Sequence, residues 1–126
     1  GPTISVIVRK SFGGASIVFG SRSLSYDLAF AWPTAEIAVM GAEGAANIIF
    51  KKDIDAAPPE QQAEVKKQKI EEYRHKFSRP YLAARRGFIN GVIAPRETRW
   101  MLVQALEMTL RQRKDRPERK HGNIPL

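Results

Sequence analysis

A short segment near the start of the chain combines cationic, hydroxyl and glycine residues. Residues 9–15 read R-K-S-F-G-G-A and follow an apolar, β-branched run at residues 4–8. A strand that leads through a glycine pair into a helix leaves the first N–H groups of that helix free for an anion or a developing oxyanion. The same pattern also fits a plain strand-to-helix turn, and it lacks the spacing of a dinucleotide fingerprint or a phosphate-binding loop. Both interpretations stay open.

Other residue types that carry chemistry are isolated. His75 and His121 are interpreted as single residues, which predicts neither a metal site nor a catalytic triad. Glu36 lies between apolar residues and is interpreted as one half of a structural ion pair, with a general-base role as the alternative. Trp32 and Trp100 are interpreted as core or interface anchors, because no further aromatic residues alternate with the Lys and Arg clusters.

Length and composition indicate one folded domain. The chain has 126 residues, of which 43% are hydrophobic and 27% are charged, and it has no cysteine. These values exclude a wholly disordered chain, a disulfide framework and a thiol nucleophile. No apolar run approaches the roughly 18 residues that span a bilayer. We therefore expect a cytoplasmic protein with no membrane insertion.

Charge is distributed unevenly along the chain. Residues 1–63 carry a net charge of −1 and residues 64–126 a net charge of +9. A basic half suggests an anionic partner, such as a nucleic acid or a phosphate-bearing cofactor, if a groove-entering motif accompanies the charge. The alternative, which we favour, is that Lys and Arg coat the outer faces of surface helices, with no nucleic acid bound.

The spacing of apolar, glycine and proline residues predicts an α/β fold. Strands are expected at residues 4–8, 28–32, 36–40 and 88–93, and helices at residues 15–24, 45–50, 60–77 and 81–86, with a boundary at residues 53–59. Gly87 is expected to end the fourth helix in the left-handed conformation. Pro95 opens a last helix, whose buried face is predicted to be Leu102, Val103, Leu106 and Leu110. Residues 115–126 form a tail without periodicity.

Several blocks of the sequence resemble the carboxyltransferase (beta) subunit of biotin-dependent acyl-CoA carboxylases of the acetyl- and propionyl-CoA carboxylase type. The blocks are R-K-S-F-G-G-A at 9–15, A-W-P-T-A-E-I-A-V-M-G at 31–41, E-Y-R at 72–74, P-Y-L-A-A at 80–84, V-I-A-P-R-E-T-R at 92–99 and K-H-G-N-I-P-L at 120–126. The resemblance implies a crotonase-like fold, a superhelix of β-β-α units. It also implies that residues 3–126 are the C-terminal part of the family's C-terminal domain, and Gly1 and Pro2 are expected to be a cloning scar.

The reaction implied by this resemblance moves a carboxyl group from N1-carboxybiotin, held on a carrier domain, to the α-carbon of an acyl-CoA. The family meets the negative charge that develops on the biotin oxygen with backbone N–H groups at the positions of Gly14 and Ala15. Gly13 and Ile17 match substrate-binding positions, and an apolar Ile17 favours a short acyl group, acetyl or propionyl. This chain departs from many members at Ser16, where they carry an aromatic residue. Biotin is the implied cofactor, and no metal is expected.

The resemblance also implies partners and alternatives. Partners are the acyl-CoA substrate, a biotin carboxyl carrier or biotin carboxylase subunit, and further copies of the subunit in a hexamer. Each active site lies between two domains, so the 126 residues alone are expected to be inactive. One alternative is the carboxyltransferase subunit of a sodium-pumping, biotin-dependent decarboxylase of the methylmalonyl-CoA type. Another is a non-catalytic assembly fragment.

Overall fold

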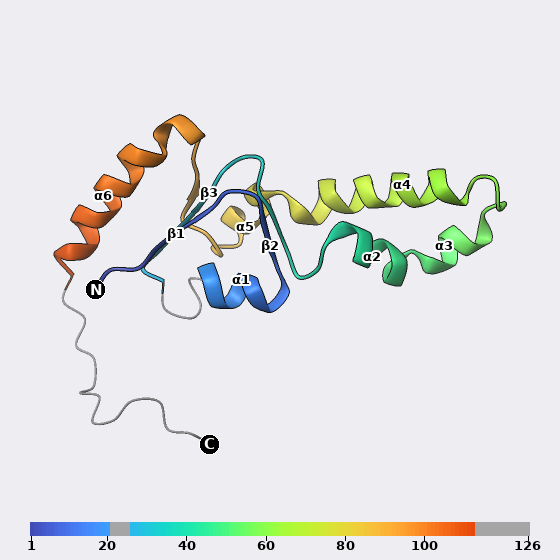
Figure 1. Cartoon of the computed structure of the whole chain (residues 1–126), viewed down its shortest axis with the longest axis horizontal. Helices are drawn as coiled ribbons and strands as arrows, with labels where there is room; N and C mark the ends of the chain where they lie inside the picture. Colours follow the sequence, from blue (N-terminus) through green and yellow to red (C-terminus); the bar gives the residue numbers. More distant parts are fainter. Residues whose placement is uncertain (21–25, 113–126) are drawn as a thin grey trace, which may run out of the picture.

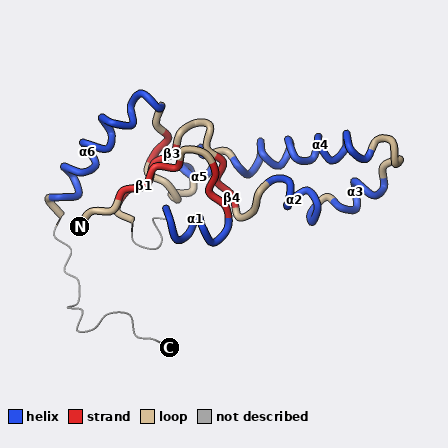
Figure 2. Tube along the Cα trace, in the orientation of Figure 1, coloured by secondary structure: helices blue, strands red, loops and turns tan. Residues whose placement is uncertain are grey.

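The computed structural model describes residues 1–20 and 26–112 (Figure 1). Leu24, within the helix predicted at residues 15–24, lies outside the described residues. So do His121, the predicted tail and the block at residues 120–126. The described part is mixed α/β, as the sequence predicted. Strands form the middle of the molecule, with one long helix on one side and an elongated helical arm on the other (Figure 2).

A three-stranded parallel sheet forms this centre. Its order is β1 (Ile4–Ile7), β3 (Leu28–Ala31) and β5 (Gly91–Val92), with Ile4 opposite Leu28 and Phe30 opposite Gly91. The central strand β3 alternates small and large side chains. Ala29 and Ala31 pack with Ala83, whereas Phe30 packs on the opposite face with Ala105. Both faces of the sheet are therefore covered, as is typical of parallel sheets.

A second, two-stranded parallel sheet pairs β2 (Lys10–Phe12) with β4 (Glu36–Ala38). The strand β4 was predicted. The first strand was predicted to end at Arg9 and Lys10, and β1 does end before them, at Ile7, but the separate strand β2 that begins at Lys10 was not predicted. The extended chain continues past them because exposed cations tolerate a sheet edge, and the Glu36 N–H donates to the Arg9 carbonyl at 2.6 Å.

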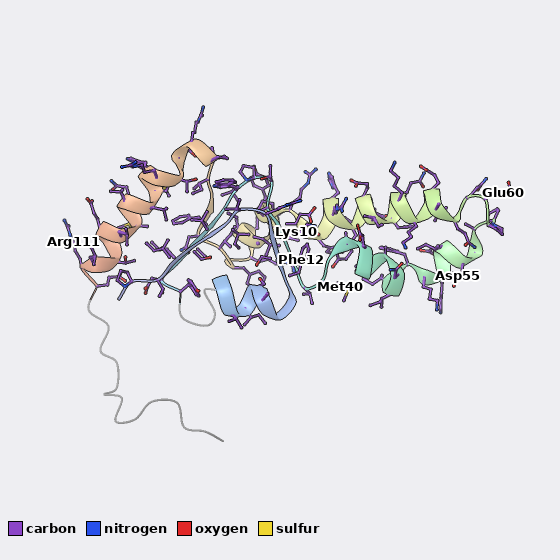
Figure 3. All side chains as sticks on the ribbon, viewed as in Figure 1. Lys10, Phe12, Met40, Asp55, Glu60 and Arg111 are labelled. Carbon is purple, nitrogen blue, oxygen red and sulfur yellow. The ribbon has the colours of Figure 1, made fainter. Side chains whose placement is uncertain are left out.

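The arm is built from three helices and one π-helical turn. They are α2 (Ala42–Ile49), α3 (Lys51–Ala56), α4 (Gln62–Tyr73) and the turn η1 (Arg74–Ser78). Asp55 and Glu60, labelled in Figure 3, mark its outer end. The sequence predicted a helix over residues 60–77, and helical backbone runs from Gln62 to Ser78, with a last turn that is π-helical. It predicted no helix at residues 51–56, so that prediction needs correction. Asp53 on α3 lies 3.9 Å from the Lys69 ammonium on α4, one contact that holds the short helix in place.

Two helices follow the arm. Pro80 opens α5 (Pro80–Arg85), and Gly87 follows it with a φ of +76°, which confirms the predicted left-handed helix end. A 3₁₀ turn η2 (Pro95–Glu97) leads into α6 (Thr98–Leu110), and the Glu97 carboxylate accepts a hydrogen bond from the Ala94 N–H at 2.9 Å.

The buried face of α6 differs from the predicted one. Ala105 and Thr109 are buried, with 2% and 8% of their surface exposed, whereas Leu110 is 68% exposed. Val103 and Leu106 are also more than two-fifths exposed, and Leu102 is only half-buried. The small Ala105 lets the helix approach Phe30 closely, and the Thr109 hydroxyl can be buried because it donates to the Ala105 carbonyl at 2.8 Å. Within the described residues, no helix has the length and apolarity that a membrane crossing requires.

Candidate active site at the start of helix α1

The glycine pair lies where β2 turns into helix α1 (Gly13–Gly20). Lys10 and Phe12, labelled in Figure 3, mark the strand that leads into it. Gly13 has a φ of +58°, and a Cβ atom there would lie 3.5 Å from the Val39 carbonyl oxygen. Only glycine adopts this conformation without strain. The helix begins at Gly13, two residues earlier than the predicted start at Ala15.

This early start leaves Gly14 and Ala15 in the first turn of the helix. The first four N–H groups of an α-helix have no acceptor within the helix. Among the described residues, the N–H groups of Gly14 and Ala15 donate to no other backbone carbonyl in a turn or loop. Both residues are exposed, and a Cβ atom on Gly14 would meet nothing within 4 Å. The two N–H groups therefore have no acceptor among the described turns and loops, and both residues are accessible to a ligand.

A cavity of about 370 Å³ adjoins this turn. We call it the apolar cavity; its lining residues are Ile7, Gly13, Ser16, Ile17, Ile37, Ala38, Val39, Tyr73, Phe77, Leu82, Ala83, Arg86, Phe88 and Ile89. Of the predicted site residues, Gly13 and Ile17 line it, and Gly14 and Ala15 lie beside it. Ile17 and Val18 on α1 are 50% and 60% exposed.

Among the lining residues that the sequence did not assign to a site are Tyr73, Phe77 and Arg86. The spacing of Ala63, Ile70, Tyr73 and Phe77 predicts instead a narrow apolar stripe on a surface helix. Ala63 is exposed instead, and the rings of Tyr73 and Phe77, 5.1 Å apart, form a wall of the cavity. Arg86 is the only charged residue among the described residues of the lining. No spacing in the sequence connects it with the glycine pair, because the fold brings the two together from 70 residues apart.

The predicted ion pair of Glu36 is present. Its Oε1 atom lies 3.4 Å from Nε of Arg74, and a second carboxylate, that of Glu71, lies 3.0 Å from Nη1 of the same guanidinium. Glu36 does not line the apolar cavity. The position of its carboxylate therefore supports the structural interpretation over a general base at the glycine pair.

These groups line a second depression of about 340 Å³. We call it the polar hollow; its lining residues are Pro33, Thr34, Ala35, Glu36, Glu71, Arg74, His75, Ser78 and Arg79. His75 belongs to no metal-binding cluster in the described residues, which contain no group of three or more potential His, Asp or Glu ligands.

The two tryptophans lie in different environments. The Trp32 indole N–H donates to the Thr98 hydroxyl at 2.9 Å, which fits the predicted core anchor. Trp100 is 63% exposed, so it is not a core residue of the described structure.

One carboxylate on the arm has a shifted pKa. A hydrogen bond from the Lys76 ammonium at 2.8 Å, and a longer one from Lys69, hold the pKa of Glu72 below its ordinary value. Glu72 therefore stays ionised and is not suited to donate a proton near neutral pH.

Comparison with known proteins agrees with this geometry. The family described as "Carboxyl transferase domain" matches residues 1–124. The chain is 51% identical over 126 residues to the methylmalonyl-CoA carboxyltransferase 12S subunit of Propionibacterium freudenreichii subsp. shermanii, covering 98% of this chain and 23% of the relative.

Two further relatives are named as subunits of a decarboxylase and of a carboxylase. The alpha subunit of methylmalonyl-CoA decarboxylase from Propionigenium modestum is 51% identical. The carboxyltransferase subunit of propionyl-CoA carboxylase from Haloferax mediterranei is 49% identical. Each alignment covers 99% of this chain and 24% of the relative, so the chain spans about a quarter of the length of these proteins.

The fold also matches solved structures. The crystal structure of the transcarboxylase 12S hexamer, with methylmalonyl-CoA and methylmalonic acid bound, superposes with a TM-score of 0.86 at 49% identity. That match covers 99% of this chain and 24% of the solved chain, and it confirms the crotonase-like fold implied by the sequence blocks. With its glycine turn, its parallel sheets and a match over residues 1–124, the chain belongs to the carboxyl transferase domain family.

Proposed function

We propose that this chain forms part of a carboxyltransferase that moves a carboxyl group between N1-carboxybiotin and the α-carbon of a short acyl-CoA. In this proposal the N–H groups of Gly14 and Ala15 donate to the ureido oxygen of biotin. One observation carries it: two free backbone donors in the first turn of α1 lie beside an apolar cavity. Membership of the carboxyl transferase domain family supports the same reaction.

The residues present fit the biotin group. A ureido oxygen needs donors that are not already engaged and a backbone that it can approach, and the open space beside Gly14 meets both needs. When bound, carboxybiotin supplies the carboxyl group and an oxygen on which negative charge develops as that group leaves. No metal is included in the proposal.

The chain itself contributes positioned donors and an apolar surface beside them. Donors that are fixed before the reaction stabilise developing charge without having to reorganise. The rigid turn at Gly13 fixes the direction of the Gly14 and Ala15 N–H groups. Apolar side chains such as Ile17, Val39 and Phe77 line the adjoining cavity. In the complete site, covering these side chains would exclude water and strengthen hydrogen bonds to charge.

We further propose that the acyl pair is propionyl-CoA and methylmalonyl-CoA. These two thioesters are the substrate and product of one carboxyl transfer at an α-carbon. The names of the three relatives refer to one or the other of them. Ile17, on the wall of the cavity, is compatible with a short alkyl group, whereas an acidic side chain at this position would be unpaired against that group.

The direction of transfer has a second candidate. A decarboxylase subunit would use the same donors to move the carboxyl group from methylmalonyl-CoA to biotin, and the 51% identity to the Propionigenium modestum subunit supports this alternative. The donors at Gly14 and Ala15 would serve both directions, because the charge on the biotin oxygen is the same.

The complete site requires more than these residues. We propose that residues 3–126 are the C-terminal part of the subunit's C-terminal domain and that turnover needs the rest of the subunit. A biotin carrier and a hexamer of subunits complete the proposed assembly. The quarter-length match and the solved transcarboxylase hexamer support this arrangement.

Ala15→Pro tests the proposed donors. The variant removes one N–H group, and proline is tolerated in the first turn of a helix because that N–H has no helical acceptor. We expect carboxyl transfer to fall about 10²- to 10³-fold, as when one oxyanion donor is removed. The assay uses a chimera in which residues 3–126 replace the matching quarter of the Propionibacterium freudenreichii 12S subunit. It follows the loss of the carboxyl group from methylmalonyl-CoA in the presence of free biotin.

Ala15→Ser is the matched control, because it changes the side chain and keeps the N–H group; we expect a rate within a few-fold of the parent chimera. A normal rate from a folded Ala15→Pro chimera would overturn the assignment of the donor. Replacing methylmalonyl-CoA with malonyl-CoA tests the acyl proposal separately, since a faster reaction with malonyl-CoA would contradict the propionyl assignment.

A further inference from the structure

Two buried polar atoms of the polar hollow have no hydrogen-bond partner. Ser78 is 1% exposed, yet its Oγ atom makes no hydrogen bond. The Nε atom of Arg74 is also buried without a hydrogen bond, since its 3.4 Å approach to Glu36 meets the distance of an ion pair but not the geometry of a hydrogen bond. Folded proteins rarely leave buried donors unpaired, because each one loses its interactions with water.

The π-helical turn η1 explains why these atoms lie together. Such turns are rare and frequently occur at functional sites. Here the turn divides its side chains between two cavities: Phe77 lines the apolar cavity, and Arg74, His75 and Ser78 line the polar hollow. Pro80 begins α5 directly afterwards, and Arg79 between them also lines the polar hollow.

The charges around the hollow favour an electron-rich ligand. Arg74 is already held by Glu36 and Glu71, whereas Arg79 forms no ion pair within the described residues. A group that accepts hydrogen bonds from the Ser78 hydroxyl and the Arg74 guanidinium, and carries negative charge opposite Arg79, would satisfy all three. The two glutamates oppose an anion and limit its affinity.

We propose that the polar hollow binds a small oxyanion, a carboxylate or a phosphate. Its oxygen atoms accept from Oγ of Ser78 and Nε of Arg74 and pair with the Arg79 guanidinium. This site is separate from the donors at Gly14 and Ala15, and it does not depend on the proposed carboxyl transfer.

The test titrates the chain with inorganic phosphate and, separately, with malonate. Chemical shifts of the backbone amides of residues 33–36 and 74–79 report binding, with sodium chloride holding the ionic strength constant. We expect saturable shifts in the millimolar range for at least one of the two anions. Comparing them distinguishes a phosphate ligand from a carboxylate ligand.

Three variants make the test specific. Ser78→Ala and Arg79→Gln should each raise the dissociation constant about tenfold, the effect of losing one hydrogen bond to a charged group. Arg85→Gln removes the same charge from an exposed residue outside the hollow and should change it less than twofold. Equal weakening by Arg85→Gln and Arg79→Gln would overturn the proposal, because it would mean that only the net charge matters. Shifts that do not saturate with either anion would also overturn it.

A second readout examines the unpaired hydroxyl without any ligand. If Ser78 Oγ is unpaired in the free chain, Ser78→Ala should leave the urea midpoint unchanged or raise it, because alanine removes a buried polar group that has no partner. A clear fall in the midpoint would show that the hydroxyl already has a partner, which would remove the basis of the proposal.

Discussion

The Arg74 guanidinium contacts one carboxylate on the arm and one on the smaller sheet, each through a different nitrogen atom. It lies 3.4 Å from Glu36 on β4 and 3.0 Å from Glu71 on α4, so it ties the arm to the smaller sheet. The two carboxylates differ in exposure: the side chain of Glu36 is 28% exposed and that of Glu71 is 66% exposed. Water screens an exposed pair, so the Glu36 contact should contribute more to stability.

Glu36→Gln should therefore lower the free energy of unfolding by about 1 kcal/mol, near the upper end for pairs that are not buried. Glu71→Gln, the matched control on the same guanidinium, should change it by less than about 0.5 kcal/mol. Urea denaturation of both variants measures the difference. An equal loss of unfolding free energy in Glu71→Gln would show that the contact of Arg74 with Glu36 on β4 contributes no more than its contact with Glu71.

At the scale of elements, the junction between β2 and α1 depends on one backbone conformation. Gly13 requires a positive φ, whereas Gly14, the next residue, does not and has open space around it. Gly13→Ala should lower the free energy of unfolding by about 1–2 kcal/mol, the cost of the left-handed conformation for a residue with a Cβ atom. Gly14→Ala should be neutral or stabilise the helix by up to about 1 kcal/mol. Thermal unfolding of the two variants measures both changes. Equal effects of Gly13→Ala and Gly14→Ala would show that the positive φ of Gly13 does not determine stability at this junction.

Elements specified by local patterns were predictable from the sequence. The run at residues 4–8 is β1, and the pairing of Pro80 with Gly87 frames α5, because proline and glycine act through their own backbone restrictions. The strand β2 and helix α3 were missed, because each depends on a neighbour: β2 pairs with β4, and α3 packs on α4.

The residues of the candidate site also divide into those that local sequence identifies and those that only the fold brings together. The glycine turn could be identified because its residues are adjacent in the chain, and the resemblance to the carboxyltransferase family assigned roles to Gly14 and Ala15. Tyr73, Phe77 and Arg86 could not be identified as cavity residues, because only tertiary packing brings them to α1. The face of α6 was mispredicted for a related reason. Apolar periodicity predicts which residues can be buried, but the neighbour that buries them comes from the rest of the fold.

At the scale of the whole molecule, α6 presents an uncovered apolar stripe. Trp100, Val103, Leu106 and Leu110 recur at helical spacing, and each is at least 43% exposed. Contiguous apolar patches on a folded surface usually mark a contact with another part of an assembly. The chain spans about a quarter of its relatives' length, so in a chimera with the 12S subunit the other three quarters of that subunit are available to cover this stripe.

Hydroxyl-radical footprinting of the two tryptophans tests whether the rest of the subunit covers the stripe. In the 126-residue chain, Trp100 should be oxidised readily, because 63% of its surface is exposed. In the chimera with the 12S subunit, its oxidation should fall several-fold, since burial of an indole excludes the radical along with water. Trp32 is the internal control: its indole N–H is held by Thr98 at 2.9 Å within this chain, so its oxidation should be the same in both proteins. If Trp100 were oxidised equally in both, the stripe would face solvent in the longer subunit too, and its apolar side chains would have to meet another subunit of the assembly.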